Sequence, residues 1–159
     1  MSLYSLSFTD SNGNTVAMSG FSGKKILFVN VASGSRYVAQ LGELEQLRTA
    51  YSDSLVVIAF PSNSFAHEPL GDSAIRTLCE TQYGAQYTIA QKGSVAGTGQ
   101  QAVYSWLSQQ SQNGVLNQAV QGDFQKFLVD GQGRIVAVFA PSVRPLDSVI
   151  QIAVAQRYP

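Results

Sequence analysis

Two nearly continuous apolar runs, Ile26–Val31 and Leu55–Phe60, constrain the fold more than any other feature of the sequence. A strand that is apolar on both faces is typically buried on both faces, as in the centre of a parallel sheet. Between the runs, apolar side chains recur at spacings of three and four, which predicts a helix of about four turns; these residues are Tyr37, Leu41, Leu44, Leu47 and Tyr51. The pattern therefore predicts a strand–helix–strand unit whose two strands are parallel.

Other segments predict further elements on both sides of this unit. Apolar and polar residues alternate over 4–9, and the turn residues Asn12-Gly13 separate them from 15–18, which predicts an N-terminal β-hairpin. A helix is expected to begin at the N-cap Asp72 and to end at Gly84. We also expect a strand at 87–89, a helix around 103–107, a hairpin of strands 127–129 and 135–139 around Asp130–Gly133, and a final helix over 146–153.

This order of elements predicts an α/β sandwich with a mixed central sheet, flanked by helices and preceded by the N-terminal β-hairpin. The closing hairpin would be antiparallel to its neighbours. A length of 159 residues is typical of one domain, so we expect a single domain over 1–159.

The composition disfavours several classes of function. Ten basic and ten acidic residues cancel and are dispersed, so we expect no nucleic-acid partner. No stretch approaches the ~18 consecutive apolar residues of a membrane-spanning helix, so we expect no membrane partner. The expectation is a soluble, cytoplasmic protein, unless an export signal has been removed from its N-terminus.

Few residues offer cofactor or metal chemistry. The single cysteine, Cys79, excludes an intramolecular disulfide, and with the single histidine, His67, it cannot build the usual Cys/His zinc sites. The glycine-rich segment Gly93–Gly99 lacks the lysine and hydroxyl residue that end a phosphate-binding loop. We therefore expect no cofactor, metal or nucleotide, and an exposed loop at 93–99.

Four separated segments carry a family resemblance: Phe21–Ser33, Glu43–Leu47, Ala59–Pro69 and Phe124–Pro141. Their order and spacing resemble those of the glutathione peroxidases, and the match extends over nearly the whole chain. The resemblance implies a thioredoxin-like fold. It also implies a family activity, the thiol-dependent reduction of hydrogen peroxide and organic hydroperoxides, although fold and function are separate questions.

The resemblance places the family's peroxidatic cysteine or selenocysteine at the start of the helix after the first buried strand. There the chain reads Val31-Ala32-Ser33-Gly34-Ser35, and we assign Ser35 to this position, with Gly34 as the alternative. A serine hydroxyl is far less acidic than a thiol, whose pKa is about 8.5, and its oxygen has no state equivalent to a sulfenic acid. Serine cannot perform this step.

The resemblance indicates that the other catalytic positions have also changed. The family's glutamine corresponds to Ser64, and its tryptophan–asparagine pair corresponds to Gly122-Asp123. Gly122 removes a large ring and its indole donor, which predicts a more open pocket. Asp123 adds a negative charge that would oppose a nearby anion. Together with Ser35, these positions lack the family's catalytic chemistry.

Cys79 stands next to Glu80, where the resemblance places the resolving cysteine of many thioredoxin-dependent relatives. An offset of one residue rotates a helical side chain by roughly 100°. Cys79 shares a helix face with Ile75 and Leu78, so we expect a buried, structural thiol.

The leading hypothesis is a non-catalytic homologue that binds a small ligand or a protein partner. One alternative is a weak thiol peroxidase acting through Cys79, with glutathione or thioredoxin as reductant. The other is a structural interaction module, which exposed apolar surface would favour.

Some other polar and aromatic residues invite a functional interpretation. We expect His67 to be a solvated surface residue, and Ser33 and Ser35 to cap a helix rather than to act in a hydrolase, because no nucleophile-elbow pattern surrounds them. Arg36 is a candidate for binding an anionic ligand, although its charge opposes the dipole of a helix starting there. Tyr104 and Trp106 are expected to pack in the core.

Overall fold

The two apolar runs form the adjacent central strands β3 (Lys25–Val31) and β4 (Leu55–Pro61) in the computed structural model, which describes residues 1–159. The two strands pair in parallel along their whole length. Every residue of Ile26–Val31 is buried, as expected for a strand that is covered on both faces. The predicted parallel strand–helix–strand unit is confirmed.

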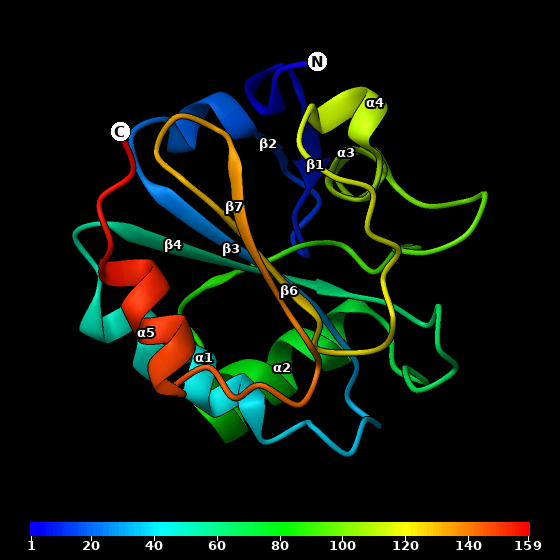
Figure 1. The fold of residues 1–159 in the computed structure, drawn as a ribbon. Helices are drawn as coiled ribbons and strands as arrows, with labels where there is room; N and C mark the ends of the chain where they lie inside the picture. The colour runs from blue at the N-terminus through cyan, green and yellow to red at the C-terminus, as the bar shows by residue number, and fades with distance from the viewer.

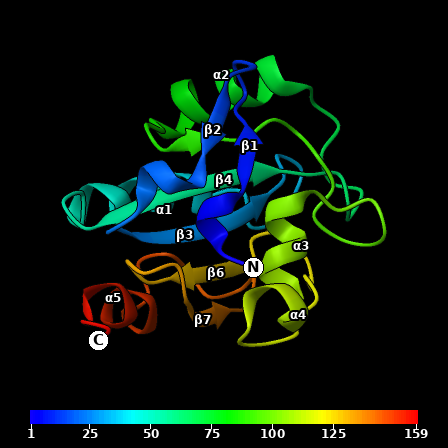
Figure 2. The ribbon, with the colours of Figure 1, turned by 90° about the horizontal axis from the view of Figure 1, so that it is seen from above.

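Three shorter strands complete a five-stranded mixed sheet in the order β5-β4-β3-β6-β7. β5 (Thr88–Ile89) is parallel to β4. β6 (Lys126–Val129) is antiparallel both to β3 and to β7 (Ile135–Phe139). Figure 2 shows β4, β3, β6 and β7 side by side in this order. The predicted antiparallel closing hairpin is therefore confirmed.

Helices and the N-terminal hairpin cover the two faces of the sheet (Figure 1). One face carries α1 (Gln40–Ala50), α2 (Asp72–Tyr83) and α5 (Ser148–Ala155). The other carries the hairpin of β1 (Ser7–Thr9) and β2 (Thr15–Ala17), the short 3-10 helices Leu3–Ser5 and Met18–Phe21, α3 (Ala102–Ser108) and α4 (Gln110–Asn113). No helix is both long and apolar enough to cross a membrane.

The alternation of side chains along β3 creates two separate cores. Leu27 and Val29 belong to the core beneath α1, α2 and α5, whereas Ile26 and Phe28 belong to the core beneath the hairpin and α3. The second core is rich in aromatic rings, and Phe60 packs edge-on against Tyr104 with ring centroids 5.1 Å apart.

The first helix is shorter than predicted, because α1 begins at Gln40 rather than at Tyr37. Tyr37 lies in a preceding turn, where its backbone N–H donates to Ser35 Oγ. Its ring still packs against the core beneath α1, so Tyr37 fits the spacing of the buried helix residues although it is not helical. The spacing of apolar residues alone does not tell a helical residue from one in a turn that packs on the same core.

The starts of two further helices also differ from the prediction. Gly71, with extended backbone, is the N-cap of α2, and Asp72 is its first helical residue. The Asp72 carboxylate accepts a hydrogen bond from Lys92 N at 2.7 Å, and no side chain caps the helix. The last helix begins after its N-cap Asp147, so Leu146 precedes it. Gly84 ends α2 in the left-handed conformation, as predicted.

The directions of the strands place four of the connecting loops at one edge of the sheet. β3 and β4 are parallel, so their carboxyl ends lie at the same edge. β6 starts at this edge because it is antiparallel to β3, and β7 ends there because it is antiparallel to β6. The loops after β3, β4 and β7 and the loop before β6 therefore meet.

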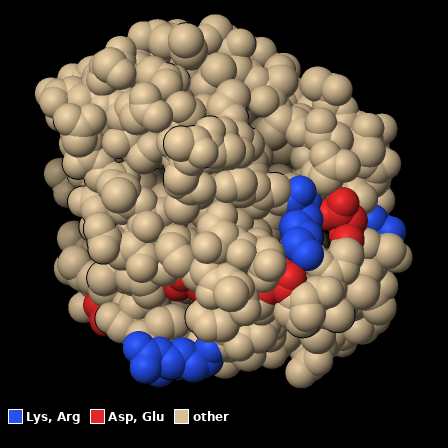
Figure 3. Space-filling model, turned by 90° about the vertical axis from the view of Figure 1, so that its right-hand side faces the viewer, with Lys and Arg blue, Asp and Glu red and all other residues tan.

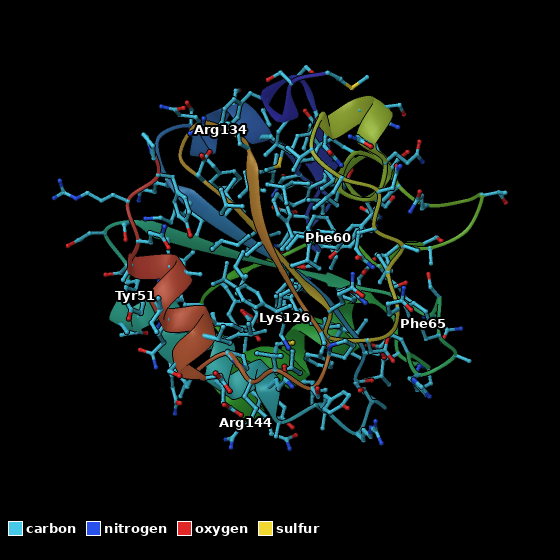
Figure 4. The ribbon with its side chains drawn as sticks, viewed as in Figure 1. Tyr51, Phe60, Phe65, Lys126, Arg134 and Arg144 are labelled. Atoms are coloured by element: carbon cyan, nitrogen blue, oxygen red, sulfur yellow. The ribbon has the colours of Figure 1, made fainter.

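A buried lysine connects this edge to the core. Lys126 has no solvent exposure, and Figure 4 shows it in the interior. Its Nζ donates to Gln40 Oε1 at 2.6 Å, to Pro141 O at 3.1 Å and to Val143 O, which engages all three ammonium protons. Burial lowers the pKa of Lys126 to about 7, against a smaller opposing effect of Glu43.

This lowered pKa predicts that the free energy of unfolding rises between pH 7 and pH 9. In that range the unfolded chain holds a proton on Lys126 that the folded chain has released, because the folded pKa of about 7 lies below the ordinary 10.5. The contribution is complete above the unfolded pKa and is lost as the pH falls through the folded pKa. Its slope is at most about 1.4 kcal/mol per pH unit. Urea unfolding at several pH values measures it.

Lys126→Met should lower the overall stability and abolish the rise, whereas Lys24→Met, at an exposed position, should retain it. The unfolding measurements end at pH 9. Burial raises the pKa of Cys79 to about 11, so above pH 9 the thiol lowers the free energy of unfolding as the pH rises. An equal rise in the Lys126→Met variant would show that Lys126 is not its source.

Candidate functional site

A pocket of about 740 Å³ lies at the edge of the sheet where the four connections meet. Phe65, which lines this pocket from the loop after β4, stands at the side of the molecule in Figure 4. Each connection contributes to the lining, which consists of Gly34, Ser35, Arg36, Tyr37, Phe65, His67, Gln121, Gly122, Asp123, Pro141 and Ser142. The pocket is thus a direct product of the mixed strand order.

Three of the four predicted site positions meet in this pocket. Ser35, Gly122 and Asp123 all line it, although Ser35 is far from the other two in the sequence. Ser64 does not line it: its hydroxyl accepts from Ser62 Oγ at 2.8 Å and from Val95 N at 3.0 Å. Ser64 faces a separate hollow beside Lys92. The structure therefore does not group Ser64 with the other three positions.

Ser35 is a nearly buried hydroxyl at the start of the turn before α1. Its Oγ accepts a hydrogen bond from Tyr37 N at 3.1 Å, so it caps this turn and not the helix that the sequence suggested. Gly34 also lines the pocket, and its N–H donates to His67 O at 2.9 Å. A Cβ at Gly34 would lie only 2.6 Å from that oxygen, which excludes a larger residue without a backbone shift.

His67 is not merely solvated, contrary to the expectation from the sequence. Its Nδ1 lies 2.6 Å from Asp123 Oδ2, and the Asp123 side chain is only 4% exposed whereas the His67 side chain is 55% exposed. The second carboxylate oxygen, Oδ1, is buried and has no hydrogen-bond partner. The two residues are far apart in the sequence and share no local motif, so only the fold reveals the pair.

Unusual backbone conformations flank both members of this pair. Ala66 and Phe124 are the only non-glycine residues with positive φ, at 65° and 71°. Ala66 directly precedes His67, and Phe124 directly follows Asp123. Such conformations cost free energy and persist only where the surrounding structure imposes them. The local backbone is therefore held in a specific shape on both sides of the pair.

The space next to the pair is open because residue 122 has no side chain. A Cβ built on Gly122 would have only one neighbour within 4 Å, the Cγ of Pro141 at 3.7 Å. Arg36 also lines the pocket, with its guanidinium over the Tyr37 ring, 4.8 Å from the ring centre, and it donates to Tyr37 Oη at 2.9 Å. Arg36 precedes α1 by four residues, so the predicted conflict with the helix dipole does not arise.

Cys79 lies outside the pocket, on the buried face of α2. It is 1% exposed and belongs with Ile75 to the core beneath α1, α2 and α5. Burial raises the pKa of its thiol to about 11, and the negative charges of Glu68 and Glu80 act in the same direction. A thiol in this environment is a poor nucleophile because its thiolate is scarce at neutral pH.

The fold and site together define the class of protein. A mixed sheet with parallel β3 and β4, an antiparallel hairpin at one edge and helices on both faces is the thioredoxin-like arrangement, and solved structures share it. Crystal structures of Trgpx in its apo form and of T. cruzi GPX1 match with TM-scores of 0.73 and 0.72, at 25% and 24% identity, covering 100% and 96% of this chain and 99% and 93% of theirs. A thiol:disulfide interchange protein from Chlorobium tepidum TLS matches with a TM-score of 0.61 at 14% identity, over 94% of this chain and 93% of its own.

Sequence comparison then gives the family. The family model "Glutathione peroxidase" matches residues 3–108. A glutathione peroxidase from Lactococcus lactis subsp. cremoris is 35% identical over 91% of this chain and 93% of its own length. The glutathione peroxidase-like peroxiredoxin 2 of Saccharomyces cerevisiae is 35% identical over 94% of this chain and 95% of its own length. The chain belongs to the glutathione peroxidase family.

The environment of Cys79 predicts that Ellman's reagent will not label the folded protein. At pH 8 a thiol with a pKa of about 11 is only about 0.1% thiolate, and burial excludes the reagent in addition. Unfolding in guanidinium chloride should release one equivalent of reactive thiol, measured by absorbance. Complete labelling of the folded protein within minutes would contradict the buried position of Cys79.

Proposed function

We propose that this protein is a glutathione peroxidase homologue without thiol peroxidase chemistry, and that it binds a small ligand in the pocket at the sheet edge. The observation that carries the proposal is the absence of a sulfur atom from the pocket, whose lining includes no cysteine and no methionine. We assign Ser35, with Gly34 as the alternative, to the place that the family resemblance gives to the nucleophile, and neither residue contains sulfur. The single thiol, Cys79, is enclosed elsewhere.

The chemistry of oxygen and sulfur supports this proposal. A peroxidatic group must attack a peroxide oxygen, become a sulfenic or selenenic acid and be reduced again by a thiol. A serine oxygen cannot complete this cycle. The names of the relatives describe peroxidases and peroxiredoxins, but that chemistry needs an atom which this pocket does not contain. Glutathione or thioredoxin therefore has no place as a reductant in the proposal.

The dimensions of the pocket favour a small ligand over a protein partner. A concave volume of about 740 Å³ lies within the range of roughly 300–1,000 Å³ typical of small-molecule sites. The exposed large hydrophobic residues are Met1, Val115, Val149 and Ile152, and none of them lines the pocket.

Charged side chains are sparse on the face in Figure 3, which offers no extended surface for a charged polymer. We place the protein in the cytoplasm, where a single free thiol stays reduced.

The first test measures thiol-dependent consumption of hydrogen peroxide and of cumene hydroperoxide by the native chain and by Cys79→Ser. We expect no turnover above buffer from either protein, with glutathione or with a thioredoxin system. Turnover by the native chain would contradict the proposal. If that turnover also disappeared in Cys79→Ser, the alternative of a peroxidase acting through Cys79 would be correct.

Ser35→Cys is the matched gain-of-function control. The backbone N–H of Tyr37 already donates to the side-chain atom at this position, so it would stabilise a thiolate there. We expect hydrogen peroxide to convert this variant to a sulfenic acid, which dimedone traps and mass spectrometry locates at residue 35. The native chain should give no dimedone adduct under the same conditions.

A further inference from the structure

Ser35, His67 and Asp123 come from three different connections and line the same pocket. We propose that they form a hydrolytic site for small acyl esters, in which Ser35 is the nucleophile, His67 is the general base and Asp123 positions His67. The inference rests on the proposed ligand pocket and gives the class of ligand, together with the reaction that follows binding.

The hydrogen bond between His67 and Asp123 fixes the orientation of the imidazole. The proposed positioning role requires an ionised Asp123, which only accepts hydrogen bonds; the proton between the two atoms 2.6 Å apart is then on Nδ1. Nε2 then carries the lone pair of the imidazole, and the His67 side chain is 55% exposed. Asp123 is nearly buried, and no donor contacts its Oδ1. The hydrogen bond with the imidazole is therefore the main interaction that offsets the free-energy cost of burying this carboxylate. This arrangement stabilises the imidazolium that forms when Nε2 takes a proton.

Ser35 has the hydrogen bonding that a nucleophilic hydroxyl requires. Its Oγ accepts from Tyr37 N, and its own O–H donates to no acceptor in the structure. The amide of Tyr37 therefore stabilises negative charge on Oγ, while the hydroxyl proton stays available to a base. The backbone hydrogen bond from Gly34 N to His67 O connects the loop after β3, which carries Ser35, to the loop after β4, which carries His67. No hydrogen bond joins Ser35 to the imidazole without substrate; catalytic contacts of this kind often tighten only when substrate binds.

A free backbone amide stands next to the nucleophile. The N–H of Arg36 donates to no acceptor, whereas the amides of Ser35 and Tyr37 on either side are both paired. The amide that follows a nucleophilic serine is a common donor to the oxyanion of acyl transfer. The structure thus supplies a nucleophile, an oriented base and one oxyanion donor in a single pocket.

The reaction balances without any cofactor. Ser35 Oγ bonds to the ester carbonyl carbon while His67 Nε2 takes the hydroxyl proton; the bond to the alkoxy oxygen breaks, and Nε2 returns the proton to the departing alcohol. Water then attacks the acyl-serine, His67 takes a proton from it, and Ser35 regains its hydrogen as the carboxylic acid leaves. The rings of Tyr37 and Phe65 line the same pocket, which suits a short acyl chain.

The experiment combines p-nitrophenyl butyrate turnover with labelling by phenylmethanesulfonyl fluoride. We expect turnover above that of free imidazole at equal concentration, and a single sulfonyl adduct that peptide mass spectrometry places on Ser35. Ser35→Ala should lose the adduct, and His67→Ala should lower turnover at least about 100-fold. Added imidazole should restore part of the His67→Ala activity. Ser52→Ala, at an exposed serine after α1, should match the native protein within about twofold.

Asp123 needs a measurement that a purely structural role would not change. His67 is the only histidine, so long-range 1H–15N NMR reports its tautomer without assignment. We expect the Nδ1–H tautomer in the native protein, and in Asp123→Asn the Nε2–H tautomer together with at least about tenfold lower turnover. If Asp123→Asn kept native turnover, the positioning role would be overturned.

Three results overturn the inference: no adduct on the native chain, an adduct on another residue, or equal turnover in native, Ser35→Ala and His67→Ala proteins. The labelling of the native chain decides the matter even if a variant does not fold. The peroxide assays are independent of these measurements. If the protein does not hydrolyse the ester, the proposed function still holds. If it consumes peroxide, the proposed function is contradicted, but the proposed ester hydrolysis is not.

Discussion

The parallel pairing of β3 and β4 is the constraint on which the rest of the structure depends. Both strands are apolar on both faces, so they are stable only as the centre of a covered sheet, and their common direction places both carboxyl ends at one edge. The antiparallel hairpin of β6 and β7 adds two more loops to that edge. Backbone pairing therefore fixes where the pocket lies, whereas the lack of a side chain at Gly122 affects how open it is.

Buried polar groups hold the loops in place around this pocket. Lys126 joins the start of α1 to the loop after β7, and Glu68, 1% exposed, accepts hydrogen bonds from the backbone amides of Ser33 and Leu70. Such groups are stable in the interior only when they are paired, so a change in one loop is opposed by the others. The two residues with positive φ beside His67 and Asp123, Ala66 and Phe124, belong to the same group of loops.

The fold could be predicted from the sequence because its determinants are local. The apolar runs, the alternation in the hairpin and Gly84 each act within a few residues. The site could be predicted only where a family motif marks a position, as at Ser35 and Asp123. Nothing in the sequence around His67 shows that it bonds to Asp123, because that contact is created by the strand order. Lys126 was missed for the same reason, since its three acceptors come from distant segments.

The electrostatics of the pocket differ from what the motifs alone suggest. In the sequence, Asp123 is an added negative charge that disfavours any neighbouring anion. In the structure that charge is buried beside His67, and the open space left by Gly122 lies next to the pair. A buried carboxylate without a partner is costly, so Asp123 depends on the imidazole that the loop after β4 supplies. The two residues therefore form one hydrogen-bonded unit, and this unit lines the same pocket as Ser35.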